Sequence, residues 1–288
     1  MITDVDVRSV VAAFYRVLLM REPDSDGLDA HVAGVASGER TIDETLAAFF
    51  RSDEFRALMP RVQQAQAPND KARFTNDHSQ YGEFEILLRH WINEAARHRI
   101  VVDVGARGRE RSNSFDLLRV FGWRGLLIEA NPALIAGIEQ EFARLQFDLL
   151  NVAVSDYEGQ ADFHIGANDD VSSLNVGTAR VWGETRGVIS VPVRRLAPLL
   201  DAHGIPPDFD LLSLDIEGED LRVLNDLVDS SDYRPRWIII EASYDYQTRS
   251  LNDLDLTNKV RGAYRIVGQT PANLILKCGI SSDLIPVS

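Results

Sequence analysis

Residues 99–105 read Arg-Ile-Val-Val-Asp-Val-Gly, an apolar run that ends in an acid and a glycine. The run is too short for a helix and is bounded by glycine, so it predicts a buried strand. Similar runs recur along the chain, at residues 125–129, 149–154, 209–215 and 237–241. Helical patterns separate most of them, as at residues 131–145 and 219–228. This alternation predicts an α/β fold with a doubly wound, mostly parallel Rossmann-like sheet.

The flanks of this region complete the predicted architecture. A helix is expected at residues 84–91, just before the first strand. Two apolar runs near the C-terminus, residues 264–268 and 273–277, lie close together in the chain and predict an antiparallel pair at the edge of the sheet. We therefore place one α/β domain at residues 78–288.

The N-terminal part has helical patterns only, which predict a small all-α domain over residues 1–60. Val10, Phe14, Val17 and Leu18 fall on one helical face. Asp24 or Ser25 can cap the next helix, and residues 41–44, Thr-Ile-Asp-Glu, have the form of a capping box. Residues 61–77 are polar, contain Pro68 and lack periodicity, which predicts a linker.

Charge and cysteine content exclude several classes of protein. With 30 Lys and Arg against 44 Asp and Glu, the net charge is −14, so we expect no nucleic-acid partner. Cys278 is the one cysteine and allows no disulfide within the chain. No secretory signal and no membrane-spanning run are recognised, so we expect a cytoplasmic protein.

The residues at the strand ends indicate the ligand, because open α/β sheets bind ligands beyond those ends. Gly105 and Gly108 allow a tight turn, and Glu129 follows about 20 residues later, where an acid commonly holds two ribose hydroxyls. No third glycine completes a dinucleotide motif, which disfavours a nicotinamide cofactor. Asp103, placed before the first glycine, suits an ammonium group, so we expect S-adenosylmethionine.

Several segments in order closely resemble the FkbM family of S-adenosylmethionine-dependent methyltransferases. They are His78-Ser-Gln-Tyr-Gly82, Val101-Val-Asp-Val-Gly-Ala106, Ser112-Asn-Ser114, Gly122–Pro132, Asn151-Val-Ala-Val154 and Leu212–Glu219. The resemblance spans residues 78–280 and implies O-methylation of sugars, glycans or natural products. It also implies a set of cofactor contacts, namely Gln80, Gly82, Asp103, Gly105, Ala106, Gly108, Glu129, Ala130 and Asn131.

Two departures from the family pattern affect these assignments. The usual Gly-Ala-Asn-x-Gly is Gly105-Ala-Arg-Gly108 here, which changes the path of the loop and leaves the role of Arg107 open. The usual Glu-Pro-Asn is Glu129-Ala-Asn131, a change that alters loop stiffness rather than chemistry.

The acids that follow the run at residues 209–215 are the candidate catalytic groups. Asp215 and Glu217, with Glu241 as a neighbour from the next strand, can act as a general base or bind a cation such as Mg²⁺. We predict the base and assign no metal site, a divalent cation being the alternative. Glu219 is expected to cap or charge the first turn of the following helix.

Histidines add one further candidate. His164 lies in a segment that commonly lines acceptor pockets, and it is the imidazole base candidate, with a surface strand histidine as the alternative. Polar residues 168–170 and 172–175 beside it have the donors and acceptors to hold sugar hydroxyls. No His or Cys spacing predicts a zinc site.

The first residues resemble a small helical domain of unknown function that occurs in bacterial surface-glycan enzymes and secreted proteins. The resemblance rests on Arg21-Glu-Pro-Asp-x-x-Gly27 and the Thr41–Phe55 region, and it implies a biological context rather than a chemistry. We interpret the domain as a helical module for docking to a partner protein or for homo-oligomerisation, with a catalytic role as the alternative.

Together these observations predict a methyltransferase that uses S-adenosylmethionine and acts on a sugar hydroxyl of a glycan, glycolipid or related natural product. A non-catalytic scaffold with the same fold is one alternative. A nicotinamide-dependent oxidoreductase is the other.

Overall fold

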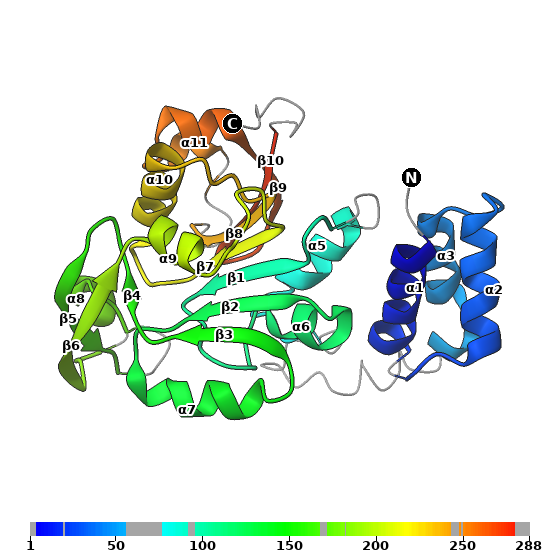
Figure 1. The fold of residues 1–288 in the computed structure, drawn as a ribbon, viewed down its shortest axis with the longest axis horizontal. Coiled ribbons are helices and arrows are strands. Elements are labelled where there is room, and N and C mark those ends of the chain that lie inside the picture. Colours follow the sequence, from blue (N-terminus) through cyan, green and yellow to red (C-terminus); the bar gives the residue numbers. More distant parts are fainter. Residues whose placement is uncertain are drawn as a thin grey trace.

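The structure is a computed structural model that describes residues 4–19, 21–55, 77–91, 96–167, 172–181, 183–242, 248 and 250–279. Figure 1 shows a group of helices at the N-terminus, a large central sheet flanked by helices, and a small second sheet beside it. Apart from Asp77, the predicted linker at residues 61–77 lies outside the described residues.

The N-terminal helices form as the sequence predicts. They are α1 (Asp4–Leu18), α2 (Ser25–Ala36) and α3 (Ile42–Arg51). Asp24 is the N-cap of α2 and accepts a hydrogen bond of 2.7 Å from the Gly27 N–H. Thr41 and Glu44 form the predicted capping box of α3, in which each side chain accepts the other residue's backbone N–H. Both predicted caps are therefore confirmed.

The large sheet confirms the predicted fold class. Its strands, in spatial order, are β3 (Gln146–Leu150), β2 (Arg124–Ile128), β1 (Ile100–Val104), β7 (Leu211–Leu214), β8 (Trp237–Glu241), β10 (Asn273–Cys278) and β9 (Tyr264–Gln269). The first five strands of this order pair in parallel, whereas β10 is antiparallel to both β8 and β9. The predicted antiparallel pair is thus present at the edge. The chain moves outward from β1 in opposite directions, which makes the β1–β7 boundary the switch point of the sheet.

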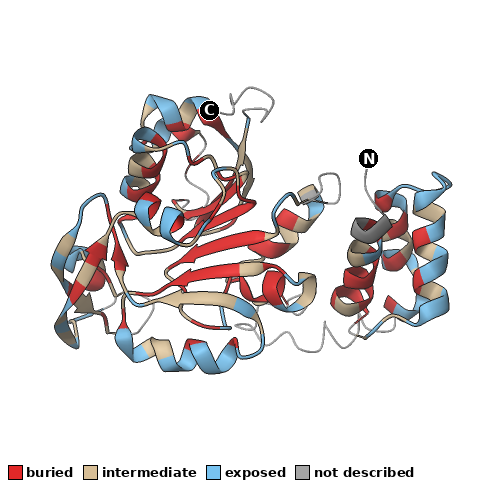
Figure 2. Cartoon of the chain, in the orientation of Figure 1, coloured by how far each residue is buried: buried red, intermediate tan, exposed pale blue. Residues whose placement is uncertain are grey.

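Helices cover both faces of this sheet, which explains why its central strands are apolar throughout. One face packs on α5 (Glu83–Trp91), α6 (Phe115–Phe121) and α7 (Pro132–Glu141), and the other on α9 (Leu196–Ala202), α10 (Asp220–Ser230) and α11 (Asn258–Ala263). Alternate residues serve the two faces: Val101 packs with the first group and Val102 with the second. Figure 2 shows the resulting buried layer across the central strands.

The predicted single strand at residues 149–154 is wrong, because the chain breaks there into two. β3 ends at Leu150, and β4 (Ala153–Val154) joins the small sheet with β6 (Gly187–Arg194) and β5 (Gly159–Ile165). The side chain of Asn151 lies at the break and donates hydrogen bonds to the backbone oxygens of Glu129 and Ala130, at 2.8 and 3.1 Å. These bonds tie the chain to the end of β2 and turn it away from the sheet. The remaining short elements are α8 (Val176–Ala179) and the 3₁₀ helix η3 (Leu251–Asp253).

The N-terminal helices contact the large domain through α1 and α6. Arg16 of α1 donates a hydrogen bond of 3.4 Å to the backbone oxygen of Val120, whose side chain packs on the core of the N-terminal helices. Within the described part of the chain, no helix combines the length and apolar character that a bilayer crossing requires.

A buried carboxylate anchors the start of the central strand. Asp210, at 1% exposure, accepts the backbone N–H groups of Arg97, His98 and Arg99 at 2.6 to 2.8 Å. It also pairs with the Arg236 guanidinium at 3.0 Å. The carboxylate thereby joins the segment before β1 to the segment before β7.

We expect Asp210→Ala to lower the free energy of unfolding by about 3 kcal/mol or more, because it leaves buried N–H groups and a cation without their acceptor. Urea denaturation measures this loss. The matched control is Asp148→Ala, which removes a half-exposed partner of Arg124 and should cost less than about 1 kcal/mol. Equal effects of the two substitutions would contradict the anchoring role.

Candidate active site

The turn after β1 is the tightest point of the site. Gly105 has a φ of +90°, and a Cβ built on it would lie 1.9 Å from the backbone oxygen of Asp215. The Gly105 and Ala106 N–H groups both donate to the backbone oxygen of Ile128, at 2.9 and 3.1 Å. Glycine is therefore required here both for its conformation and for space. The turn brings the ends of β1, β2 and β7 into direct contact.

A cleft with about 940 Å³ of space, partly open to solvent, lies beyond these strand ends. Its position at the switch point is the one expected for ligands in open α/β sheets. Many of the predicted site residues line it, namely Gln80, Gly105, Glu129, Ala130, Asn131, Asp215 and Glu217. Other predicted residues are described by the structure but do not line this cleft: Gly82, Asp103, Ala106, Gly108 and His164.

Glu129 follows β2 and presents a buried carboxyl group at the cleft. Its Oε1 accepts the Asn131 N–H at 2.6 Å, and only 7% of the residue is exposed. Burial raises the pKa of the Glu129 carboxyl to about 7, against the opposing effect of the Asn131 and Ala130 N–H groups. Asn131 caps α7 by accepting the Ala133 N–H, so its side chain has a structural role at the cleft wall.

Asp103 lies under the cleft rather than in it. As an odd-numbered residue of β1, like Val101, it faces the helices α5 and α6. Its carboxylate accepts a 2.5 Å hydrogen bond from the Ser114 hydroxyl, beside Ser213, the partner of Asp103 on β7. Burial raises the pKa of Asp103, and hydrogen bonds from these two serines oppose the rise. The structure thus shows Asp103 binding the residues around the start of α6.

His164 lies on β5 next to a residue that does line the cleft. Phe163 contributes to the wall of the cleft, and successive side chains of a strand point to opposite faces. The backbone of His164 exchanges two hydrogen bonds with Ser173. Of the polar loop beside it, residues 168–170 lie outside the described residues, whereas Ser172 and Leu174 line the cleft.

Three carboxylates from two strand ends meet at the cleft. Asp215, Glu217 and Glu241 have oxygen atoms that all lie within 4.8 Å of one another. Burial, followed by the charge of Glu241, raises the pKa of Asp215 well above its usual value. Burial also raises the pKa of Glu241 to about 8, with a further contribution from Glu217. Carboxylates this close can share protons and accept another from a ligand, or can ligate a hard divalent cation.

A fourth acid, Asp220, shapes the loop that carries these groups. Its buried carboxylate accepts the Ile216 and Gly218 N–H groups at 2.9 and 3.0 Å. The backbone of Glu217 between them is left-handed, with φ +54°, and its carbonyl accepts a 2.7 Å hydrogen bond from the Ser173 hydroxyl. A strained residue held by several bonds is typical of a functional site.

Glu219 departs in part from the expectation that it caps α10. It occupies the N-cap position and lies 3.6 Å from Arg222 in the first turn, but its side chain makes no cap hydrogen bond. Its Oε2 accepts a 2.7 Å hydrogen bond from the Ser155 hydroxyl instead. The side chain therefore connects the loop to the end of β4, and the loop N–H groups are satisfied by Asp220.

A second, more open groove with about 1270 Å³ of space adjoins the cleft and shares Glu241 with it. The groove is rich in carboxylates, and its lining includes Asp156, Asp220, Arg222, Asn225, Asp226, Asp229 and Asp255. Some of these charges are paired, as in the 2.6 Å contact between Asp226 and Arg195. The lining remains acidic on balance.

Two residues of the site, Asp220 and Phe163, were not predicted from the sequence. Asp220 had a detectable signal, since an acid at the first position of a helix can accept the N–H groups of the preceding loop. Phe163 had none, because its contact with the cleft depends on how the small sheet packs against Ala130 in the loop after β2.

A doubly wound sheet with a polar cleft at its switch point defines a Rossmann-like protein. Residues 103–261, more than half of the 288, match the Methyltransferase FkbM domain, and the chain belongs to this family of methyltransferases. Residues 2–59 match a domain of unknown function (DUF4214). Both resemblances predicted from the sequence are thus confirmed. No curated protein matches the chain.

The raised pKa of Glu241 predicts a pH-dependent stability. The folded protein binds a proton at this carboxyl up to about pH 8, whereas the unfolded chain releases it near 4.5. The free energy of unfolding therefore falls as the pH rises through this window, with a slope of up to about 1.4 kcal/mol per pH unit for one proton. In Glu241→Gln this slope should be shallower, as measured by urea denaturation at pH 5, 6.5 and 8.5. Identical pH profiles of the two proteins would contradict the shifted pKa.

Proposed function

We propose that the protein is an S-adenosylmethionine-dependent O-methyltransferase that acts on a sugar hydroxyl of a glycan, glycolipid or related natural product. The observation that carries the proposal is a single cleft that combines the glycine turn, Glu129 and the carboxylates Asp215 and Glu241. The family supports methyl transfer. The cofactor and the class of acceptor are our inference.

The residues of the cleft suit the methyl donor. Glu129 is an acceptor at the position expected for ribose hydroxyls, and Gly105 lets the backbone approach a ligand closely. Gln80 adds an amide that can donate and accept hydrogen bonds. The first helix after this turn, α6, begins only at Phe115, so no helix N-terminus follows directly to receive a pyrophosphate. This arrangement favours a nucleoside without phosphates over a dinucleotide.

The role proposed for the carboxylates follows from their pKa values. S-adenosylmethionine, when bound, supplies an activated methyl group for displacement by an acceptor oxygen. Burial raises the pKa values of Asp215 and Glu241, so the ionised form of the pair, whose share grows as the pH rises towards about 8, is a stronger base than an ordinary carboxylate and accepts the proton that a hydroxyl loses. The pair thus serves as the general base, and the strand ends that carry it hold it in place. His164, the base candidate proposed from the sequence, does not line the cleft, so we prefer the carboxylates.

We place the acceptor in the groove that shares Glu241 with the cleft. Carboxylates and the amide of Asn225 can receive hydrogen bonds from several sugar hydroxyls at once. Because the lining is acidic on balance, it disfavours an anionic acceptor. The groove therefore supports an uncharged, hydroxyl-rich acceptor.

The cofactor proposal is tested by calorimetry with S-adenosylmethionine and with NAD. We expect binding of the first only, and Glu129→Ala should weaken it about 10- to 100-fold, since a hydrogen-bond acceptor to the ribose is lost. Glu184→Ala, at an exposed residue that pairs with Arg180, serves as the control and should bind normally. Binding of NAD in place of the methyl donor would overturn the assignment in favour of an oxidoreductase.

The catalytic proposal is tested with Asp215→Asn in an assay of labelled methyl transfer into cell-envelope glycans. We expect kcat to fall about 10²- to 10⁴-fold, the range typical of general-base removal, while the Kd of S-adenosylmethionine changes less than about threefold. Asp162→Asn, at an exposed position of β5, should keep full activity. If the wild-type protein binds the donor but transfers no methyl group to any hydroxylated acceptor, a non-catalytic scaffold is the better description.

A further inference from the structure

Residues 77–83, which we call the strap, run past the turn after β1 and contribute Gln80 to the cleft wall. Three buried carboxylates hold the strap by its backbone. They are Asp77 and Glu83 within the strap and Asp116 on α6, at 5%, 0% and 4% exposure. Each accepts an N–H group of a different strap residue, and these residues are His78, Ser79 and Tyr81.

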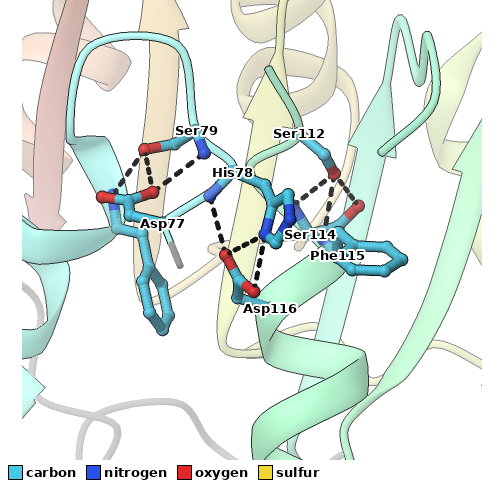
Figure 3. Close-up of polar contacts among 8 residues, drawn as sticks. Asp77, His78, Ser79, Ser112, Ser114, Phe115 and Asp116 are labelled. Carbon is cyan, nitrogen blue, oxygen red and sulfur yellow. Dashed lines mark hydrogen bonds and ion pairs between the residues drawn. The ribbon is translucent and has the colours of Figure 1, made fainter. Parts of the chain in front are cut away.

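The contact between Asp116 and His78 joins the strap to α6. The Asp116 carboxylate accepts the His78 backbone N–H at 2.8 Å and also lies 2.9 Å from Nδ1 of the His78 ring. The ring packs edge-on against Phe115. Figure 3 shows both contacts, with the carboxylate of Asp116 directed at the strap.

The other two carboxylates anchor the strap on its remaining sides. Asp77 accepts both the N–H and the hydroxyl of Ser79, and that hydroxyl in turn accepts the Phe84 N–H at the start of α5. Glu83 accepts the Tyr81 N–H and is bound to the β9–β10 hairpin by Thr270 and Asn273, at 2.8 and 2.9 Å. Gln80 lies between these anchored residues.

The strap also pairs with the loop after β1. Ser79 forms a parallel backbone bridge with Arg111, and Gln80 and Arg111 both line the cleft. Near the end of the strap, Gly82 has a φ of +90°, which allows the chain to turn into α5. The side chain of Gln80 is therefore presented by a backbone that is fixed before any ligand arrives.

We propose that Asp116 is a positioning residue of the cofactor site, which acts by holding the strap through His78 so that Gln80 faces the bound methyl donor. The inference rests on the proposed function. Its physical basis is preorganisation: a wall that is already ordered spares the ligand the entropy cost of ordering it. Loss of the anchor should weaken binding without altering the chemistry of the carboxylates.

The test compares the full-length wild type with Asp116→Ala, Asp116→Asn, Gln80→Ala and the double variant Gln80→Ala/Asp116→Ala. We expect Asp116→Ala to raise the Kd of S-adenosylmethionine at least about tenfold, with kcat at saturating donor within about twofold. Asp116→Asn keeps one oxygen acceptor for the His78 N–H and should restore most of the affinity. The double variant should bind no more weakly than Gln80→Ala alone, because both changes remove the same contact.

Hydrogen exchange of the strap amides, measured without ligand, tests the anchor independently of binding. We expect faster exchange at residues 78–82 in Asp116→Ala, a melting temperature lower by about 2 to 8 °C because a buried N–H group loses its acceptor, and wild-type exchange in the control Asp148→Ala. Faster exchange with an unchanged Kd would overturn the positioning role, as would fully additive effects in the double variant. Failure of the wild type to bind the donor at all would refute the proposed function and this inference with it.

Discussion

The site depends on the contact between the turn after β1 and the backbone that leaves β7. A side chain at position 105 cannot fit, because the carbonyl oxygen of Asp215 occupies the place of its Cβ. The Asp215 N–H donates to the backbone oxygen of Val104 at 3.0 Å, which joins the end of β7 to the end of β1. This contact fixes where the cleft opens and sets the carboxylates beside it. The other walls of the cleft surround this contact between Gly105 and Asp215, which involves backbone atoms only.

The sequence predicted the parts of the molecule that depend on local pattern. Strands buried on both faces appear as apolar runs, and the distance from Gly105 to Glu129 reflects one loop, the helix α6 and the strand β2. The direction in which a side chain points was not predicted from the sequence in the same way. Asp103 was expected at the ligand, but its position in the strand turns it towards Ser114 on the neighbouring helix. The break at Asn151 was missed because the hydrogen bonds that cause it run to a separate strand end.

In the acid cluster, sequence spacing predicted which residues lie together, whereas their pKa values depend on tertiary structure. Asp215 and Glu217 were recognisable as residues after a strand, and parallel neighbouring strands suggested Glu241 as their companion. The raised pKa values of Asp215 and Glu241 arise from burial first and then from neighbouring charges, namely Glu241 for Asp215 and Glu217 for Glu241, and no spacing encodes these effects. Likewise, the left-handed backbone of Glu217 depends on bonds from Ser173 and on the carboxylate of Asp220.

In the loop after β7, the residues that fix the backbone conformation differ from the residues that carry the reactive groups. Asp220 and Ser173 secure the path of the main chain, whereas the side chains of Asp215 and Glu217 project from it. A framework of this kind tolerates replacement of the projecting groups without collapsing. It gives protein engineers, and natural selection before them, a scaffold on which a different reactivity can be installed by changing one or two side chains.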